Sequence, residues 1–115
     1  MKAYEQIAVA FSSALVSGDF ETAHALLAPP LRDELAPQAL RKELHTMFEG
    51  YADGAPTHID FNDEFSLDDW PEKQPQDVGW AYVSIIGDDF VEAVAVVVSD
   101  VEGDLLIRTI EWGRP

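Results

Sequence analysis

The stretch FVEAVAVVVSDVEGDLLIRTIEW, residues 90–112, decides the fold class. Its first part, residues 90–98, is apolar at every position except Glu92. Its last part, residues 104–112, is rich in branched and aromatic residues. Glu102 and Gly103 lie between the two parts, where a glycine is typical of a tight turn. The pattern predicts two strands joined as an antiparallel hairpin.

Two further strands are predicted on the N-terminal side of this hairpin. Residues 57–65 alternate between apolar and polar side chains, which is typical of a half-exposed strand. Residues 78–86 are rich in aromatic and branched residues, and a turn at residues 87–89 connects them to the hairpin. An acidic loop between these two strands contains two prolines.

The first fifty residues have a helical pattern instead, because apolar residues recur there every three or four positions. Gly18 is placed to end the first helix, and Asp19 is placed to cap the second. The pair Pro29-Pro30 is expected to end the second helix, since proline does not continue a helix. The three predicted helices span residues 3–17, residues 20–27 and the segment from Ala36-Pro37 to Gly50.

The order of three helices followed by strands predicts an α+β fold. We expect the N-terminal helices to pack on one face of a bent antiparallel sheet of about four main strands. At 115 residues the chain has the length of a single domain, residues 1–115, with one hydrophobic core.

The charge of the chain is strongly negative. It contains 22 Asp and Glu residues against seven Lys and Arg residues, for a formal net charge of −15. This charge disfavours nucleic acids and anionic membranes as partners. It favours either solubility alone or a basic protein partner. The chain has no cysteine, no recognisable signal peptide and no apolar stretch long enough to span a bilayer, so we expect a cytoplasmic protein.

The acids are concentrated between residues 60 and 77. Seven acids lie in this segment against the single base Lys73, and so many carboxylates are expected to be exposed to solvent. We expect Asp68, Asp69 and Glu72 to form the part of this acidic face that would contact a basic partner.

Arg108 is the only basic residue in the four predicted strands. On an otherwise apolar strand it needs a carboxylate partner or a ligand. One interpretation is a structural ion pair with Glu92 or Glu111. The other places Arg108 in a cavity, where it would orient an acidic or carbonyl-bearing ligand. The candidate cavity residues are Arg108, Trp80, Tyr82, Trp112 and His45; the aromatic members could equally fill the core.

Signals for a metal site or for catalysis are weak. The three histidines, His24, His45 and His58, have no spacing typical of metal ligands. Residues 60–64 are similar to the start of a calcium-binding loop, but the glycine and glutamate that such a loop requires are replaced by Phe65 and Pro71. We therefore expect no metal, no cofactor and no assigned catalytic residue.

The chain resembles the nuclear transport factor 2-like superfamily, the cystatin-like cone that includes ketosteroid isomerases and polyketide cyclases. The resemblance lies in the order of the elements and in Phe11, Leu15, Gly18-Asp19-Phe20, Ala23, Leu26-Leu27, Leu40 and Ile107-Arg108-Thr109-Ile110-Glu111-Trp112. It implies a bent sheet that wraps around the helices and encloses a cavity. Members of the superfamily include isomerases, cyclases, dehydratases and binding modules, so the fold alone selects no function.

Three functions remain open from the sequence. The first is a domain that binds a small apolar ligand or a protein partner without catalysis. The second is an acidic inhibitor, of the immunity type, that neutralises a basic partner. The third is a cavity enzyme of isomerase, cyclase or dehydratase type. Because residues 90–98 are apolar on both faces, we also expect a homodimer through the outer face of the sheet.

Overall fold

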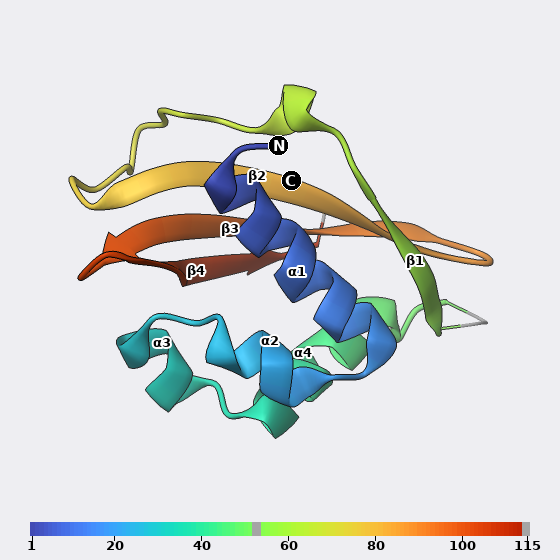
Figure 1. Ribbon diagram of the computed structural model, residues 1–115. Helices are drawn as coiled ribbons and strands as arrows, with labels where there is room; N and C mark the ends of the chain where they lie inside the picture. Colours follow the sequence, from blue (N-terminus) through green and yellow to red (C-terminus); the bar gives the residue numbers. More distant parts are fainter. Residues whose placement is uncertain (52–53, 114–115) are drawn as a thin grey trace.

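The computed structural model describes residues 1–51 and 54–113, and it has the predicted α+β architecture (Figure 1). Helices precede strands along the chain, and four helices lie on one face of a four-stranded antiparallel sheet. The elements are α1 Ala3–Ser17, α2 Phe20–Ala25, α3 Pro29–Glu34, α4 Pro37–Phe48, β1 Pro56–Phe61, the short 3-10 helix η1 Asp63–Phe65, β2 Asp77–Gly87, β3 Val91–Val101 and β4 Asp104–Trp112.

The sheet is a meander in which each strand pairs with the next one in sequence, in the order β1-β2-β3-β4. The hairpin of β3 and β4 turns through Glu102 and Gly103, both of which have positive φ angles, 55° and 95°. The bounds of β4 agree with the predicted strand, because this turn fixes where it begins.

The helix ends follow from their capping residues. Gly18 adopts a left-handed conformation with φ 79° and ends α1. Asp19 caps α2, since its side chain accepts a hydrogen bond from the backbone N–H of Thr22. The short helix α3 was not predicted from the sequence. The prediction that Pro29 and Pro30 end the second helix is wrong, because α2 already ends at Ala25; the prolines occupy the first positions of α3, where the missing proline N–H costs nothing.

The first strand is shorter than predicted. It ends at Phe61, because the Asn62 side chain accepts a hydrogen bond from the N–H of Glu64 and starts the 3-10 helix η1. After η1 the chain returns to the edge of β2, where Leu67 and Trp80 exchange two backbone hydrogen bonds of 2.9 Å. The segment after β1 therefore prolongs the pairing along β2.

One hydrophobic core fills the space between the helices and the sheet. Alternate residues of β2 and β3 face the helices, contact α1 and belong to one buried cluster with residues of α1 and α4. The largest fully buried side chains include Phe11 and Leu15 of α1, Leu40 and Leu44 of α4, and Ile85 and Ile107 of the sheet.

The chain also covers the middle of the edge strand β4. The linker between α2 and α3 runs parallel to β4 at Ile107. The N–H of Ile107 donates to the carbonyl of Leu26, and its carbonyl accepts from the N–H of Ala28, at 2.9 and 2.7 Å.

Candidate functional site

Arg108 forms an ion pair with Asp77, and neither predicted partner, Glu92 or Glu111, takes that place. Its Nε atom donates to Oδ1 of Asp77 at 2.8 Å, and its Nη2 atom donates to Oδ2 at 2.7 Å. This two-point geometry is the strongest form of an arginine–carboxylate contact. The pair joins the start of β2 to β4 across β3.

The carboxylate of Asp77 is fully enclosed by protein. Its side chain is 0% exposed, and it also accepts hydrogen bonds from Ser99 Oγ and from the backbone N–H of Gln74. Burial alone would raise the pKa of Asp77, but the hydrogen bonds from Arg108, Ser99 and Gln74 outweigh it and lower the pKa to about 2. Asp77 is therefore charged at neutral pH and holds Arg108 in one orientation.

The ion pair between Arg108 and Asp77 was not predicted from the sequence for two reasons. The β3–β4 register shifts between Val97 and Val98, which pair with Thr109 and Ile107, so Arg108 is an additional residue in a β-bulge. The bulge breaks the regular alternation of the strand, by which Arg108 would share a face with Ile110 and Trp112; these two pack against the core. Asp77 lies 31 residues away and was assigned to the acidic loop.

Arg108 also lines a groove next to α3. This hollow, which we call the α3 groove, has a volume of about 400 Å³. Its apolar wall comes from Pro29, Pro30 and Leu31 of α3 and from Val101 at the end of β3. Arg108 is one quarter exposed there, so the pair with Asp77 leaves part of the guanidinium open to the groove.

The aromatic candidates of β2 lie on the other face of the sheet. Ala81, Val83 and Ile85 face the helices, so the alternating residues Trp80 and Tyr82 point away from them. The two rings stack at 6.2 Å between centroids, and Phe65 of η1 meets the Tyr82 ring edge-on at 5.6 Å. Trp80 and Tyr82 pair in register with Val97 and Ala95 of β3, whose side chains are buried.

Exposed apolar residues gather on or beside this face. Leu67 shares it because it pairs directly with Trp80, and Val91 shares it because it alternates with Phe90 and Glu92 on β3. We define the outer sheet face by Phe65, Leu67, Trp80, Tyr82 and Val91. Among the described residues, the exposed large hydrophobic ones are Met1 and Val78, and three members of this face: Phe65, 54% exposed, Leu67, 42%, and Val91, 47%.

Acids accompany these apolar residues. Asp60 of β1 pairs with Ser84 and Glu111 of β4 pairs with Ala95, so both carboxylates lie on the outer side of the sheet, and both residues are exposed. The strands contain no Lys or Arg except Arg108, whose charge is compensated by Asp77. The outer sheet face therefore combines an apolar centre with negative charge.

The acidic segment is exposed only in part. Asp69 and Glu72 are exposed as predicted, and Asp68 is exposed too, but its carboxylate contacts Lys2 at 3.0 Å and accepts a hydrogen bond from Tyr4. The hydrogen bond and the charge of Lys2 lower the pKa of Asp68. The prediction that all seven acids are exposed is wrong at Asp77, because that carboxylate is buried against Arg108.

The five candidate cavity residues do not form one site. Trp112 is partly buried against the core, whereas Trp80 and Tyr82 lie on the opposite face of the sheet. His45 is exposed on α4, and Arg108 lines the α3 groove. Among them, the structure brings together the stacked pair Trp80 and Tyr82.

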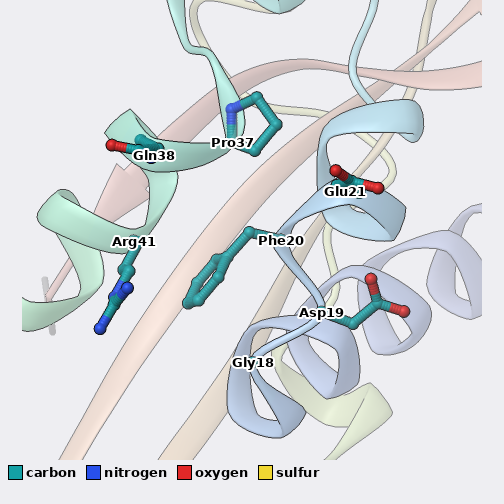
Figure 2. Close-up of a pocket in the computed structure, with 7 residues that line it drawn as sticks. All are labelled: Gly18, Asp19, Phe20, Glu21, Pro37, Gln38 and Arg41. Carbon is teal, nitrogen blue, oxygen red and sulfur yellow. The ribbon is translucent and has the colours of Figure 1, made fainter.

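A further hollow of about 330 Å³ lies where the α1–α2 turn meets the start of α4 (Figure 2). Figure 2 shows the Phe20 ring turned toward Arg41, whereas the carboxylates of Asp19 and Glu21 point away from them. Asp19 is already engaged as the cap of α2. A binding site requires polar groups that converge on one point, and the polar groups of this hollow do not converge.

The described part of the chain contains no cluster of three or more His, Asp and Glu side chains that could hold a metal ion. His24 Nε2 lies 2.9 Å from the carbonyl of Arg32, and His58 Nδ1 lies 2.8 Å from Thr57 Oγ1. None of the helices in residues 1–51 and 54–113 is both long and apolar enough to cross a membrane.

The fold and these surfaces define the chain as an α+β domain with an antiparallel meander. No family model matches it, and no curated protein or solved structure matches it either. The resemblance to the nuclear transport factor 2-like superfamily accordingly stays a prediction from the residues.

Proposed function

We propose that this protein is a non-catalytic binding domain that docks a basic protein partner on the outer sheet face. The observation that carries the proposal is the pair of exposed apolar residues Phe65 and Leu67 beside the stacked rings of Trp80 and Tyr82. Val91 extends the same face toward the β2–β3 turn, where it pairs with Ile86. Contiguous exposed apolar surface of this kind is typical of interaction sites. Aromatic residues also contribute most to the affinity of protein interfaces.

Charge selects the class of partner. Asp60 and Glu111 lie on the same side of the sheet, and the exposed acids Asp63 and Glu64 adjoin Phe65 in the chain. The formal net charge of the whole chain is −15. A partner segment in which Lys or Arg side chains flank apolar ones matches this surface, and its approach would be accelerated by electrostatic attraction.

A second copy of the chain is the competing occupant, as the homodimer expectation states. The exposed apolar residues favour it, but the charge opposes it, because each copy brings −15 to the interface. We therefore propose the basic partner and treat self-association as the alternative outcome of the experiment. The acidic inhibitor is the particular form of this function that the excess of exposed carboxylates supports.

The experiment uses three synthetic peptides of equal length with alternating Lys and Leu, Glu and Leu, or Lys and Ser. Binding is followed by NMR at the Trp80 indole and the Val91 methyl groups. We expect the Lys/Leu peptide to bind, and to bind more weakly as salt rises, because surface charges are screened over about 8 Å at ~0.15 M ionic strength. The Glu/Leu peptide should not bind.

Two variants locate the site. Val91→Lys places a positive charge in the outer sheet face and should weaken binding of the Lys/Leu peptide about tenfold, which corresponds to roughly 1.4 kcal/mol. Thr46→Lys adds the same charge on the exposed end of α4 and should leave binding within about twofold.

Three outcomes would contradict the proposal. If the Lys/Ser peptide bound as tightly as the Lys/Leu peptide, charge attraction alone would explain binding and the apolar residues would have no role. An equal loss in both variants would place the site elsewhere. Sedimentation of a dimer that Val91→Lys dissociates would show that a second copy occupies the face.

A further inference from the structure

The α3 groove is a second surface, separate from the outer sheet face, and it has a polar end and an apolar wall. Pro29 and Pro30 supply rings without a backbone N–H, and Leu31 and Val101 add aliphatic side chains. The volume of about 400 Å³ lies within the range of small-molecule sites. The apolar wall of the α3 groove provides contact area for a ligand, so a polar group of that ligand must be recognised at the polar end of the groove.

That polar end is the outer edge of the Arg108 guanidinium. The Nε and Nη2 atoms donate to Asp77, and within the described residues Nη1 has no hydrogen-bond partner. Yet the described residues contain no buried side-chain nitrogen or oxygen that lacks a partner. Nη1 is therefore not fully buried, and since Arg108 lines the groove and its side chain is one quarter exposed, we infer that the Nη1 donors face the groove.

The orientation of these donors is fixed before any ligand arrives. Asp77 holds one edge of the guanidinium through two N–H groups, and Ser99 and the Gln74 N–H hold the carboxylate in turn. A donor that is already positioned loses little conformational entropy when a ligand oxygen binds to it, which increases affinity.

Charge decides which oxygen suits this donor. Asp77 cancels the formal charge of Arg108, and the exposed carboxylates of Asp100 and Glu102 belong to residues that also line the groove. An anion would be repelled by these two acids, and a cation, although the acids attract it, offers no lone pair to the Arg108 donors. A neutral oxygen acceptor satisfies both conditions.

We propose that the α3 groove binds a neutral, largely apolar small molecule whose carbonyl oxygen accepts a hydrogen bond from Arg108 Nη1. The apolar part of the molecule lies against Pro29, Pro30, Leu31 and Val101. This site does not depend on the docking of a protein on the outer sheet face.

The test uses three soluble probes that share a phenyl group and a short chain. Benzylacetone carries a neutral carbonyl, hydrocinnamate replaces its methyl ketone by a carboxylate, and phenylpropylamine carries a cation. Each is titrated into the whole protein and followed through the backbone amide signals of Ser99 and Val101 and the Arg108 side-chain signals. Benzylacetone should saturate these signals in the millimolar range, and the two ions should bind at least about fivefold more weakly.

Variants keep the Arg108–Asp77 pair intact, so that a loss of binding is not a loss of folding. Pro30→Trp places a large ring in the groove at an exposed position and should lower the affinity for benzylacetone about tenfold. Thr46→Trp, on the exposed end of α4, is the matched control and should leave the affinity unchanged, as should Val91→Lys.

Equal or tighter binding of either ion would overturn the assignment of a neutral acceptor. Unchanged binding in Pro30→Trp, or signals that never saturate, would remove the site. Neither result would affect the outer sheet face, because the peptide experiment there reads Trp80 and Val91.

Discussion

The ring of Tyr4 occupies the space in which a side chain at position 79 would lie. Tyr4 is buried at the start of α1, and a Cβ atom added to Gly79 would collide with its ring carbons. The absence of a side chain at Gly79 therefore lets the first turn of α1 approach β2 closely.

We expect Gly79→Ala to lower the free energy of unfolding by about 1–3 kcal/mol, because the added methyl group overfills a packed region. Gly50→Ala is the control, since a Cβ there would meet nothing within 4 Å, and it should change the free energy by less than about 0.5 kcal/mol. Urea unfolding measures both. Equal stability of the two variants would show that Tyr4 moves aside at no cost.

The Asp77–Arg108 pair should make stability depend on pH in the acid range. The pKa of Asp77 is lowered from 3.8 to about 2 in the folded protein, so its ionised form stabilises the fold. This contribution, about 2 kcal/mol, is present above pH 3.8 and is lost as the pH falls through the folded pKa of about 2.

Asp77→Asn should therefore be less stable than the parent protein at neutral pH, and the gap should narrow as the pH falls from about 4 to about 2. Asp33→Asn, on the exposed surface of α3, controls for the loss of one negative charge. Thermal unfolding across this pH range supplies the comparison. A gap that stays constant with pH would mean that Asp77 acts through packing and not through its charge.

Association with a basic partner should depend on the exposed acids before β2. The double variant Asp69→Asn with Glu72→Gln should slow association of the Lys/Leu peptide about two- to fivefold at low salt, because charges at the rim of an interface act mainly on the association rate. We leave Asp68 unchanged because Lys2 already compensates it. Stopped-flow fluorescence measures the rate.

The matched control for this rate is Asp33→Asn with Glu34→Gln, which removes the same charge from exposed positions of α3. It should slow association less. If both double variants slow it equally, the net charge of the chain steers the partner and the acidic loop has no special role.

Gly18 should tolerate asparagine better than alanine. Its φ of 79° is left-handed, and its N–H donates to the carbonyls of Ala14 and Leu15 to close α1. Gly18→Ala should cost about 1 kcal/mol in chemical unfolding, and Gly18→Asn less, because asparagine adopts this conformation more readily. The reverse order would show that the turn relaxes to a different conformation.

The sequence predicts most of the fold because the signals that set it are local. The α+β order, the cap at Gly18, the cap at Asp19 and the turn at Gly103 each depend on a few neighbouring residues. The helix α3 was missed because two prolines indicate the end of one helix as readily as the start of another.

The candidate site was predicted less well because its contacts are not local. Asp77 lies 31 residues before Arg108, and the bulge at Arg108 has no signature in a strand of branched residues. The alternation of a strand puts Trp80 and Tyr82 on one face, but this periodicity does not say which face the helices cover.

The contact between Ile107 and the linker from Leu26 to Ala28 affects the tendency of this chain to aggregate at high concentration. An edge strand with free backbone groups is a template on which another molecule can add its own strand, and that is one route to amyloid-like growth. Here the protein fills the middle of that template with two of its own hydrogen bonds. A change that loosens this linker would expose β4 at its centre, so the linker protects the molecule from its neighbours.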